Sequence, residues 1–215
     1  MAKIYPSLMG ADLLNLQKVI EVLEHDADGF HIDIMDNRFV PNITWGVDTV
    51  NAVARISRVP LWVHLMVVDP INWNENLMLP RGTTVTFHLE SEKEIPRLIK
   101  EIKEKKCRPS IAIKPETSAE QIFPILNAID HVLLMSVNPG FSGQPFLEAT
   151  KKKIEQLVAY RDTSGDDFVI GLDGGVTIEN IKELAQMGVD EFAISAGIFS
   201  QKDPLKALKE IKKII

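Results

Sequence analysis

The sequence has little cysteine and no long apolar run. Cys107 is the only thiol among 215 residues, so no internal disulfide can form, which is typical of a reducing compartment. No segment approaches the length that crosses a bilayer, and the first residues lack the apolar stretch of a secretory signal. We therefore expect a cytoplasmic protein that does not act at a membrane.

Positive charge, repeats and linkers are also scarce. The net charge is −6, and a nucleic-acid binder needs a basic face that this balance does not suggest, so we expect no nucleic-acid partner. An anionic substrate must then be held by a local pocket. Because no Gly/Ser/Pro-rich linker divides the chain and 45% of it is hydrophobic, residues 1–215 are predicted to form a single domain.

Short apolar segments rich in β-forming residues recur along the chain, and helical patterns lie between them. Apolar residues follow helical spacing at Leu98, Ile99 and Ile102, for example. Eight alternations of strand and helix in one small domain predict an α/β fold, a single (β/α)₈ TIM barrel, with a doubly wound open sheet as the alternative. The expected strands are residues 3–7, 29–35, 61–66, 83–88, 110–113, 131–136, 168–172 and 191–195.

His31 and Asp33 interrupt the second of these strands and share one of its faces, because a strand alternates faces with period two. A buried, ionised aspartate is costly unless another group pairs with it. Taken alone, the pair is more simply interpreted as a core histidine beside a carboxylate. His64 in the third strand and Asp173 after the seventh change this interpretation, because the carboxyl ends of barrel strands meet at one mouth.

Two imidazoles and two carboxylates, from His31, Asp33, His64 and Asp173, are thus expected together. This is a normal ligand set for zinc, and it also suits iron, manganese or cobalt. The sequence predicts one divalent metal ion per chain, with zinc favoured. His88 and Glu90, at the end of the fourth strand, lack a third partner in the sequence and are interpreted as support for the ligands or for the structure.

Further candidate binding residues follow the strand ends. Methionines at the mouth are either core filler or a dry wall around a planar intermediate. The glycine-rich segment after the sixth strand is either an ordinary turn or a lid that cradles an anion. Loops after the seventh and eighth strands often bind phosphate through backbone N–H groups in this architecture. These candidates are Met35, Met66 and Met135; Gly140, Phe141, Ser142 and Gly143; Gly174 and Gly175; and Ser195, Ala196 and Gly197.

Several ordered motifs make the chain recognisable: residues 6–8, 31–36, 39–42, 63–66, 135–141, 143–144 and 173–175. With these motifs the chain resembles the ribulose-phosphate 3-epimerase family along nearly its whole length. The resemblance implies a barrel of the ribulose-phosphate-binding type, an isomerase that inverts C3 of a phosphorylated ketose, and a homo-oligomer.

The resemblance also implies the roles of individual residues. His31, Asp33, His64 and Asp173 would bind the metal, and Asp33 and Asp173 would also form the acid/base pair. A proton next to a ketone leaves at neutral pH only if the remaining charge is stabilised, which a metal ion can do as a Lewis acid. Ser7 would contact the substrate, the three methionines would flank the intermediate, and the loops after strands six to eight would hold the phosphate.

The chain departs from the family pattern at Asn37, where glycine is usual, at Lys114 before Pro115, and at Ser195-Ala196, where Gly-Ser is usual. Some segments look more like the hexulose-phosphate branch, typified by D-allulose-6-phosphate 3-epimerase. The expected reaction is therefore D-allulose 6-phosphate to D-fructose 6-phosphate, slightly favoured, or D-ribulose 5-phosphate to D-xylulose 5-phosphate.

Two other functions remain open from the sequence. A phosphosugar synthase, aldolase or decarboxylase on a similar barrel could use a lysine near the reacting carbon, and Lys114 is the candidate. A non-catalytic phosphosugar sensor could keep the fold, although it would not need two histidines and two opposed aspartates.

Overall fold

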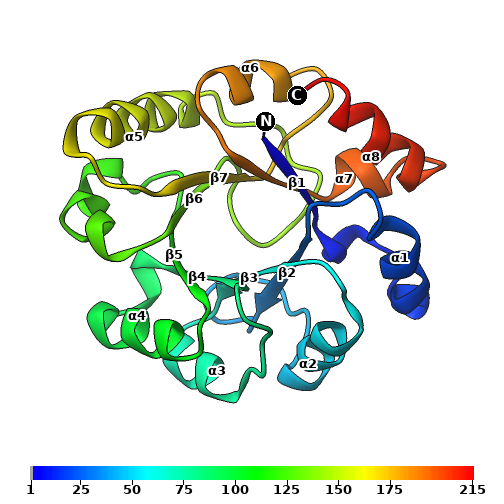
Figure 1. The fold of residues 1–215 in the computed structure, drawn as a ribbon, viewed down its shortest axis with the longest axis horizontal. Coiled ribbons are helices and arrows are strands. Elements are labelled where there is room, and N and C mark those ends of the chain that lie inside the picture. The colour runs from blue at the N-terminus through cyan, green and yellow to red at the C-terminus, as the bar shows by residue number, and fades with distance from the viewer. Residues whose placement is uncertain (1) are drawn as a thin grey trace.

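The computed structural model describes residues 2–215 as a barrel of eight parallel strands inside a layer of helices (Figure 1). The strands are hydrogen-bonded in the order β1-β8-β7-β6-β5-β4-β3-β2. A parallel bridge between Ser7 and His31 joins β1 to β2 and brings the two ends of the sheet together. The strands are β1 (Lys3–Pro6), β2 (Phe30–Met35), β3 (Leu61–Met66), β4 (Thr84–His88), β5 (Arg108–Ile113), β6 (His131–Met135), β7 (Val169–Asp173) and β8 (Glu191–Ile194).

The connections between the strands are mostly α-helical. The helices between strands are α1 (Leu16–Leu23), α2 (Val47–Ile56), α3 (Pro70–Asn76), α4 (Ile95–Glu104), α5 (Thr150–Ser164) and α6 (Ile181–Gln186), and α7 (Ala196–Phe199) and α8 (Pro204–Lys212) follow β8. Short 3₁₀ segments cover Leu8–Gly10, Leu13–Asn15 and Leu89–Ser91, and a longer one, Ala119–Ala128, connects β5 to β6. No helix among residues 2–215 is long and apolar enough to cross a membrane.

These elements confirm the predicted (β/α)₈ barrel, and the doubly wound sheet was the wrong alternative. Eight of the sixteen predicted strand ends were wrong by one or two residues. β5 begins at Arg108 rather than 110, while β1 ends at Pro6 and β8 at Ile194, because Ser7 and Ser195 already belong to the turns that follow.

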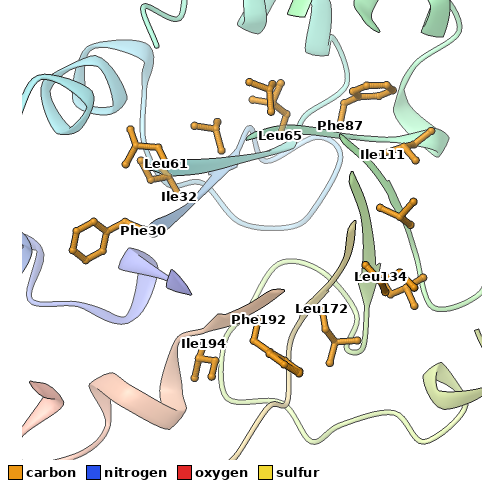
Figure 2. Close-up of a cluster of buried hydrophobic side chains, with 14 of the residues drawn as sticks. Phe30, Ile32, Leu61, Leu65, Phe87, Ile111, Leu134, Leu172, Phe192 and Ile194 are labelled. Carbon is orange, nitrogen blue, oxygen red and sulfur yellow. The ribbon is translucent and has the colours of Figure 1, made fainter. Parts of the chain in front are cut away.

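The hydrophobic core lies between the strands and the helices. Figure 2 shows side chains such as Phe30, Leu61, Phe87 and Phe192 on the outer side of the strands. Helix α4 covers part of this surface with Leu98, Ile99 and Ile102, which are all buried. Each strand thus places alternate residues in this outer core and leaves the others to fill the barrel interior.

The barrel interior is polar at the amino end of the strands. Trp62 donates from Nε1 to Thr86 (2.8 Å), Thr86 donates to Ser110 (2.7 Å), and the Ser110 hydroxyl lies 2.7 Å from Nδ1 of His131. Gly171 leaves room for this layer, since a Cβ atom there would lie 2.5 Å from the His131 ring. This end of the barrel is therefore filled with side chains.

Candidate metal centre and active site

The four predicted metal ligands lie together at the carboxyl end of the strands. In the parallel register of β2 and β3, Asp33 stands opposite His64. Asp173 is the last residue of β7. One ligand atom from each of His31, Asp33, His64 and Asp173 can be chosen so that all four lie within 4.8 Å of one another. Strands far apart in the chain thus meet at one small site.

The spacing of these atoms suits a metal shell. Nε2 of His31 and Nδ1 of His64 lie 3.0 and 3.1 Å from Oδ1 of Asp33, and 3.8 and 3.6 Å from Oδ2 of Asp173. Ligand atoms bound to tetrahedral zinc at about 2.0–2.2 Å are roughly 3.3–3.6 Å apart. The donor set and its separations therefore fit a divalent cation.

The buried charges of the site attract positive charge. Burial opposes ionisation of Asp33, but the charge and hydrogen bonds of His31 and His64 outweigh it and hold the Asp33 pKa well below its usual range. Burial also disfavours the charged form of His64, yet hydrogen bonds with Asp173 and Asp33 raise its pKa to about 9. In the metal-free protein a proton on His64 neutralises part of the negative charge that a cation would otherwise balance.

His64 has a second hydrogen-bonding neighbour that sequence reasoning missed. Its Nε2 lies 2.9 Å from Nε2 of His88, whose Nδ1 lies 3.2 Å from Oε2 of Glu90. The other Glu90 oxygen accepts from the backbone N–H of Lys114 (2.9 Å) and from the Thr117 hydroxyl. The missing third partner of His88 and Glu90 is therefore Thr117, on the loop after β5, and no local spacing in the sequence indicates it.

The side chain of Lys114 contacts Phe39 and does not line the cavity. Its Nζ lies 4.1 Å from the centroid of the Phe39 ring, and Lys114 is absent from the described residues that line the cavity. The lysine that a synthase or decarboxylase mechanism would need is thus engaged in a cation–π contact elsewhere.

A cavity opens above the two aspartates, with an empty volume of about 740 Å³ that includes open solvent. Asp33 and Asp173 form part of its wall, whereas His31 and His64 are fully buried behind it. All the predicted substrate-binding residues line this one cavity: Ser7, Met35, Met66, Met135, Gly140, Phe141, Ser142, Gly143, Gly174, Gly175, Ser195, Ala196 and Gly197. Met9 and Thr177, which were not among the predicted site residues, line it as well, and so does Gln144 of the 143–144 motif.

The cavity has an apolar side. Met35 and Met66 form a buried cluster with Val40, and Met135 is almost fully buried. The methionines are thus packed like core residues and also line the cavity, so the two interpretations of them are compatible.

The other side of the cavity is built from loop backbone. Gly140 has a φ of 128°, and its carbonyl accepts from Nδ2 of Asn42 (2.7 Å). Gly174 and Gly175 have φ angles of 107° and 61°, and a Cβ on Gly175 would lie 2.5 Å from the Phe146 backbone. The Ser195 hydroxyl is buried without a hydrogen-bond partner among residues 2–215. These loops present small residues and bare backbone to the cavity.

A parallel (β/α)₈ barrel with a cluster of potential metal ligands at the carboxyl ends of its strands has the architecture of a barrel enzyme. The Ribulose-phosphate 3 epimerase family model matches residues 3–199. Ribulose-phosphate 3-epimerase of Helicobacter pylori is 37% identical over 212 residues, covering 99% of this chain and 97% of that protein. The Escherichia coli K12 enzyme of the same name is 34% identical over 211 residues, covering 97% and 94%. The chain belongs to the ribulose-phosphate 3-epimerase family, and it is an isomerase that acts on a phosphorylated sugar.

Solved structures of lower identity share the fold. KGPDC from Streptococcus mutans superposes with a TM-score of 0.69 at 15% identity, covering 100% of this chain and 97% of that one. Orotidine 5'-monophosphate decarboxylase from Sulfolobus solfataricus gives a TM-score of 0.71 at 15% identity, covering 100% and 98%. At this identity the similarity shows the barrel fold alone.

Proposed function

We propose that the chain interconverts D-ribulose 5-phosphate and D-xylulose 5-phosphate by metal-dependent epimerisation at C3. The observation that carries the proposal is the placement of two carboxylates, Asp33 and Asp173, on the wall of one cavity beside two buried histidines. The names of the relatives at 34–37% identity support ribulose phosphate as the substrate.

His31, Asp33, His64 and Asp173 would hold one divalent cation, with zinc favoured over iron, manganese or cobalt because two imidazoles and two carboxylates suit it well. The bound cation would supply a Lewis acid that stabilises negative charge developing on the ketone oxygen. This set of four residues would hold one cation per chain.

The two aspartates would move the protons. One carboxylate removes the proton from C3, and the other, protonated, delivers a proton to the opposite face of the same carbon, so that charge balances over a turnover. Ser7 donates to Oδ2 of Asp33 at 2.7 Å and would orient that carboxylate. In the reverse reaction the two aspartates exchange roles.

The rest of the cavity would bind and shield the substrate. Met35, Met66 and Met135 would exclude water from the reacting carbon. The loops of Gly140–Gly143, Gly174–Gly175 and Ser195–Gly197 would hold the phosphate through backbone N–H groups. We also propose a cytoplasmic, homo-oligomeric enzyme, as the family resemblance suggests; light scattering of the purified protein tests the second point.

The mechanism is tested by the fate of the C3 hydrogen. Epimerisation in D₂O should place deuterium at C3 of the product, and Asp33→Asn and Asp173→Asn should each lower kcat by about 10²–10⁴-fold. Zinc content must be measured in each variant, because both residues are also proposed ligands. Retention of the original hydrogen at C3 would contradict the mechanism.

A six-carbon substrate is the second candidate, because Ser195-Ala196 replaces the usual Gly-Ser of the family and these residues line the cavity. A comparison of kcat/KM for D-ribulose 5-phosphate and D-allulose 6-phosphate decides between them, since one extra hydroxymethyl group discriminates only if the pocket is shaped for it. A higher value for the hexulose phosphate would overturn our substrate assignment and leave the chemistry intact.

A further inference from the structure

We propose that Glu90 and His88 act as positioning residues that fix where the protons of His64 lie, and so direct the Nδ1 lone pair of His64 at the metal centre. The proposal rests on the metal-dependent function proposed above. His88 contacts the side of His64 that faces away from Asp33 and Asp173.

Glu90 is held by donors on one of its two carboxylate oxygens. Oε1 accepts from the backbone N–H of Lys114 and from the hydroxyl of Thr117. Nζ of Lys153 donates to the carbonyls of Lys114 and Pro115 (2.9 and 2.8 Å), which ties this loop to α5. The Glu90 carboxylate therefore has a defined orientation, and its free oxygen, Oε2, points at His88.

The hydrogen bond that Glu90 accepts from His88 determines the tautomer of His88. Oε2 of Glu90 lies 3.2 Å from Nδ1 of His88, and a carboxylate accepts but does not donate, so Nδ1 must carry the proton. In a neutral imidazole the other nitrogen, Nε2, is then an acceptor. That nitrogen lies 2.9 Å from Nε2 of His64, so His64 must be the donor.

On the neutral ring of His64, a donating Nε2 leaves Nδ1 without a proton and free to bind a metal ion. Nδ1 is the atom that lies 3.1 Å from Oδ1 of Asp33 and 3.6 Å from Oδ2 of Asp173. In the opposite arrangement, His88 carries its proton on Nε2 and neutral His64 carries its proton on Nδ1. A lone pair of His88 would then face the Glu90 carboxylate, and an N–H of His64 would lie in the centre of the ligand set. One anchored glutamate thus selects the metal-binding tautomer through two histidine rings.

Packing keeps the two rings in this relation. The rings of His64 and His88 are stacked with centroids 5.0 Å apart and an interplanar angle of 26°. Phe39 covers His88 at a centroid distance of 4.7 Å, and both histidines are completely buried. Water cannot easily replace a lost hydrogen bond here, so a change at Glu90 should reach the metal site.

Glu90→Gln is the sharpest test, because it keeps the size of the side chain but places an amide where His88 needs an acceptor. Glu94→Gln, on an exposed carboxylate at the start of α4, is the matched control. Zinc affinity is measured by competition with a chromophoric chelator, and circular dichroism of the metal-free proteins reports folding. We expect Glu90→Gln to weaken zinc binding by about 10–100-fold and Glu94→Gln to leave it unchanged.

Nitrogen-15 NMR of the histidine rings gives a readout that a purely structural role would not move. In the wild-type protein His88 should carry its proton on Nδ1, with Nε2 bare, and in Glu90→Gln the proton should shift to Nε2. His88→Phe keeps a ring against Phe39 but cannot accept from His64, so it should lose zinc affinity to a similar extent. If Glu90→Gln fails to fold, Thr117→Val, which removes one donor to Glu90, should still weaken zinc binding several-fold.

The outcomes separate this proposal from the proposed function. If the wild-type protein binds no divalent metal, the metal-dependent function fails, and the NMR tautomer alone decides on the hydrogen-bond chain. If the wild-type protein binds zinc and Glu90→Gln binds it equally well, or if wild-type His88 carries its proton on Nε2, the positioning role is overturned.

Discussion

At the residue scale, the side chain of Asp33 is the most constrained polar group of the site. Its Oδ2 accepts from Ser7 and its Oδ1 lies near both His31 and His64, while the side chain is only 3% exposed. A carboxylate with so many neighbours has little freedom to rotate. This restriction suits the two roles proposed for Asp33, which are to bind a cation and to meet one particular carbon atom.

Ser7→Ala tests how much of this orientation the serine provides. A hydrogen bond to a charged group contributes about 1.5–3 kcal/mol, so its loss should lower kcat by roughly ten- to a hundred-fold while zinc stays bound. Steady-state kinetics and metal analysis of the same preparation measure both quantities. Ser164→Ala, at the end of α5, is the control, and an unchanged kcat in Ser7→Ala would show that Asp33 is oriented without the serine.

Individual residues differ in how well the sequence predicted them. The cluster of potential metal ligands could be predicted because each of its residues lies in a strand, and period two together with barrel geometry brings strand ends to one mouth. Asn37, which stands where glycine is usual in the family, has a φ of 57°, a left-handed backbone that asparagine tolerates better than most residues. The contact of Glu90 with Thr117 joins residues 27 positions apart through a loop whose path no local pattern indicates.

At the element scale, the strands were predictable and one connection was not. Parallel strands that are buried on both faces read as short apolar runs, so their existence and order were clear. The connection between β5 and β6 is a 3₁₀ helix with Pro124 inside it. Proline removes a backbone donor and disfavours the α-helix, which explains why this segment departs from the expected helix.

Gly175→Ala tests the loop between β7 and α6 as a phosphate-binding element. Gly175 needs a left-handed backbone, and a Cβ there would also meet the backbone of Phe146, so the loop must move. We expect KM for the phosphorylated substrate to rise at least tenfold, with a smaller change in kcat and unchanged zinc affinity.

Gly165→Ala is the matched control for this variant. Gly165 also has a positive φ, 76°, but a Cβ there meets nothing within 4 Å, and the residue follows α5 away from the cavity. The Gly165→Ala substitution should lower the free energy of unfolding by about 1 kcal/mol without changing KM. Equal KM values in the two glycine variants would remove this loop from phosphate binding.

At the scale of the whole molecule, the polar interior makes stability depend on pH. Burial, followed by the positive charge of Arg108, holds the pKa of His131 well below its usual value, so this histidine is neutral in the folded protein. In the unfolded chain it binds a proton below about pH 6.5. The contribution of neutral His131 to the free energy of unfolding is therefore complete above that pH. It is lost as the pH falls, at about 1.4 kcal/mol per pH unit.

Urea unfolding between pH 7.5 and 5 measures this dependence. In His131→Gln the free energy of unfolding should fall less steeply with decreasing pH than in the wild-type protein, by about 1.4 kcal/mol per pH unit. His25→Gln, on an exposed histidine, should keep the wild-type slope. A wild-type slope in His131→Gln would mean that the buried ring does not take up a proton on unfolding.

A bound metal ion should stabilise the barrel as a whole, because its proposed ligands lie on three strands, β2, β3 and β7. Strands β8 and β1 separate β7 from β2 along the ring, so the ion would join distant parts of the sheet. A ligand present at about 100 times its Kd stabilises the folded state by about 2.7 kcal/mol. For a chain of this size that corresponds to a rise in Tm of roughly 5–10 °C. Calorimetry with excess zinc and then with EDTA should show this difference in the wild-type protein and lose it in Asp173→Asn. Equal Tm values with zinc and with EDTA in the wild-type protein would contradict a metal centre shared by these strands.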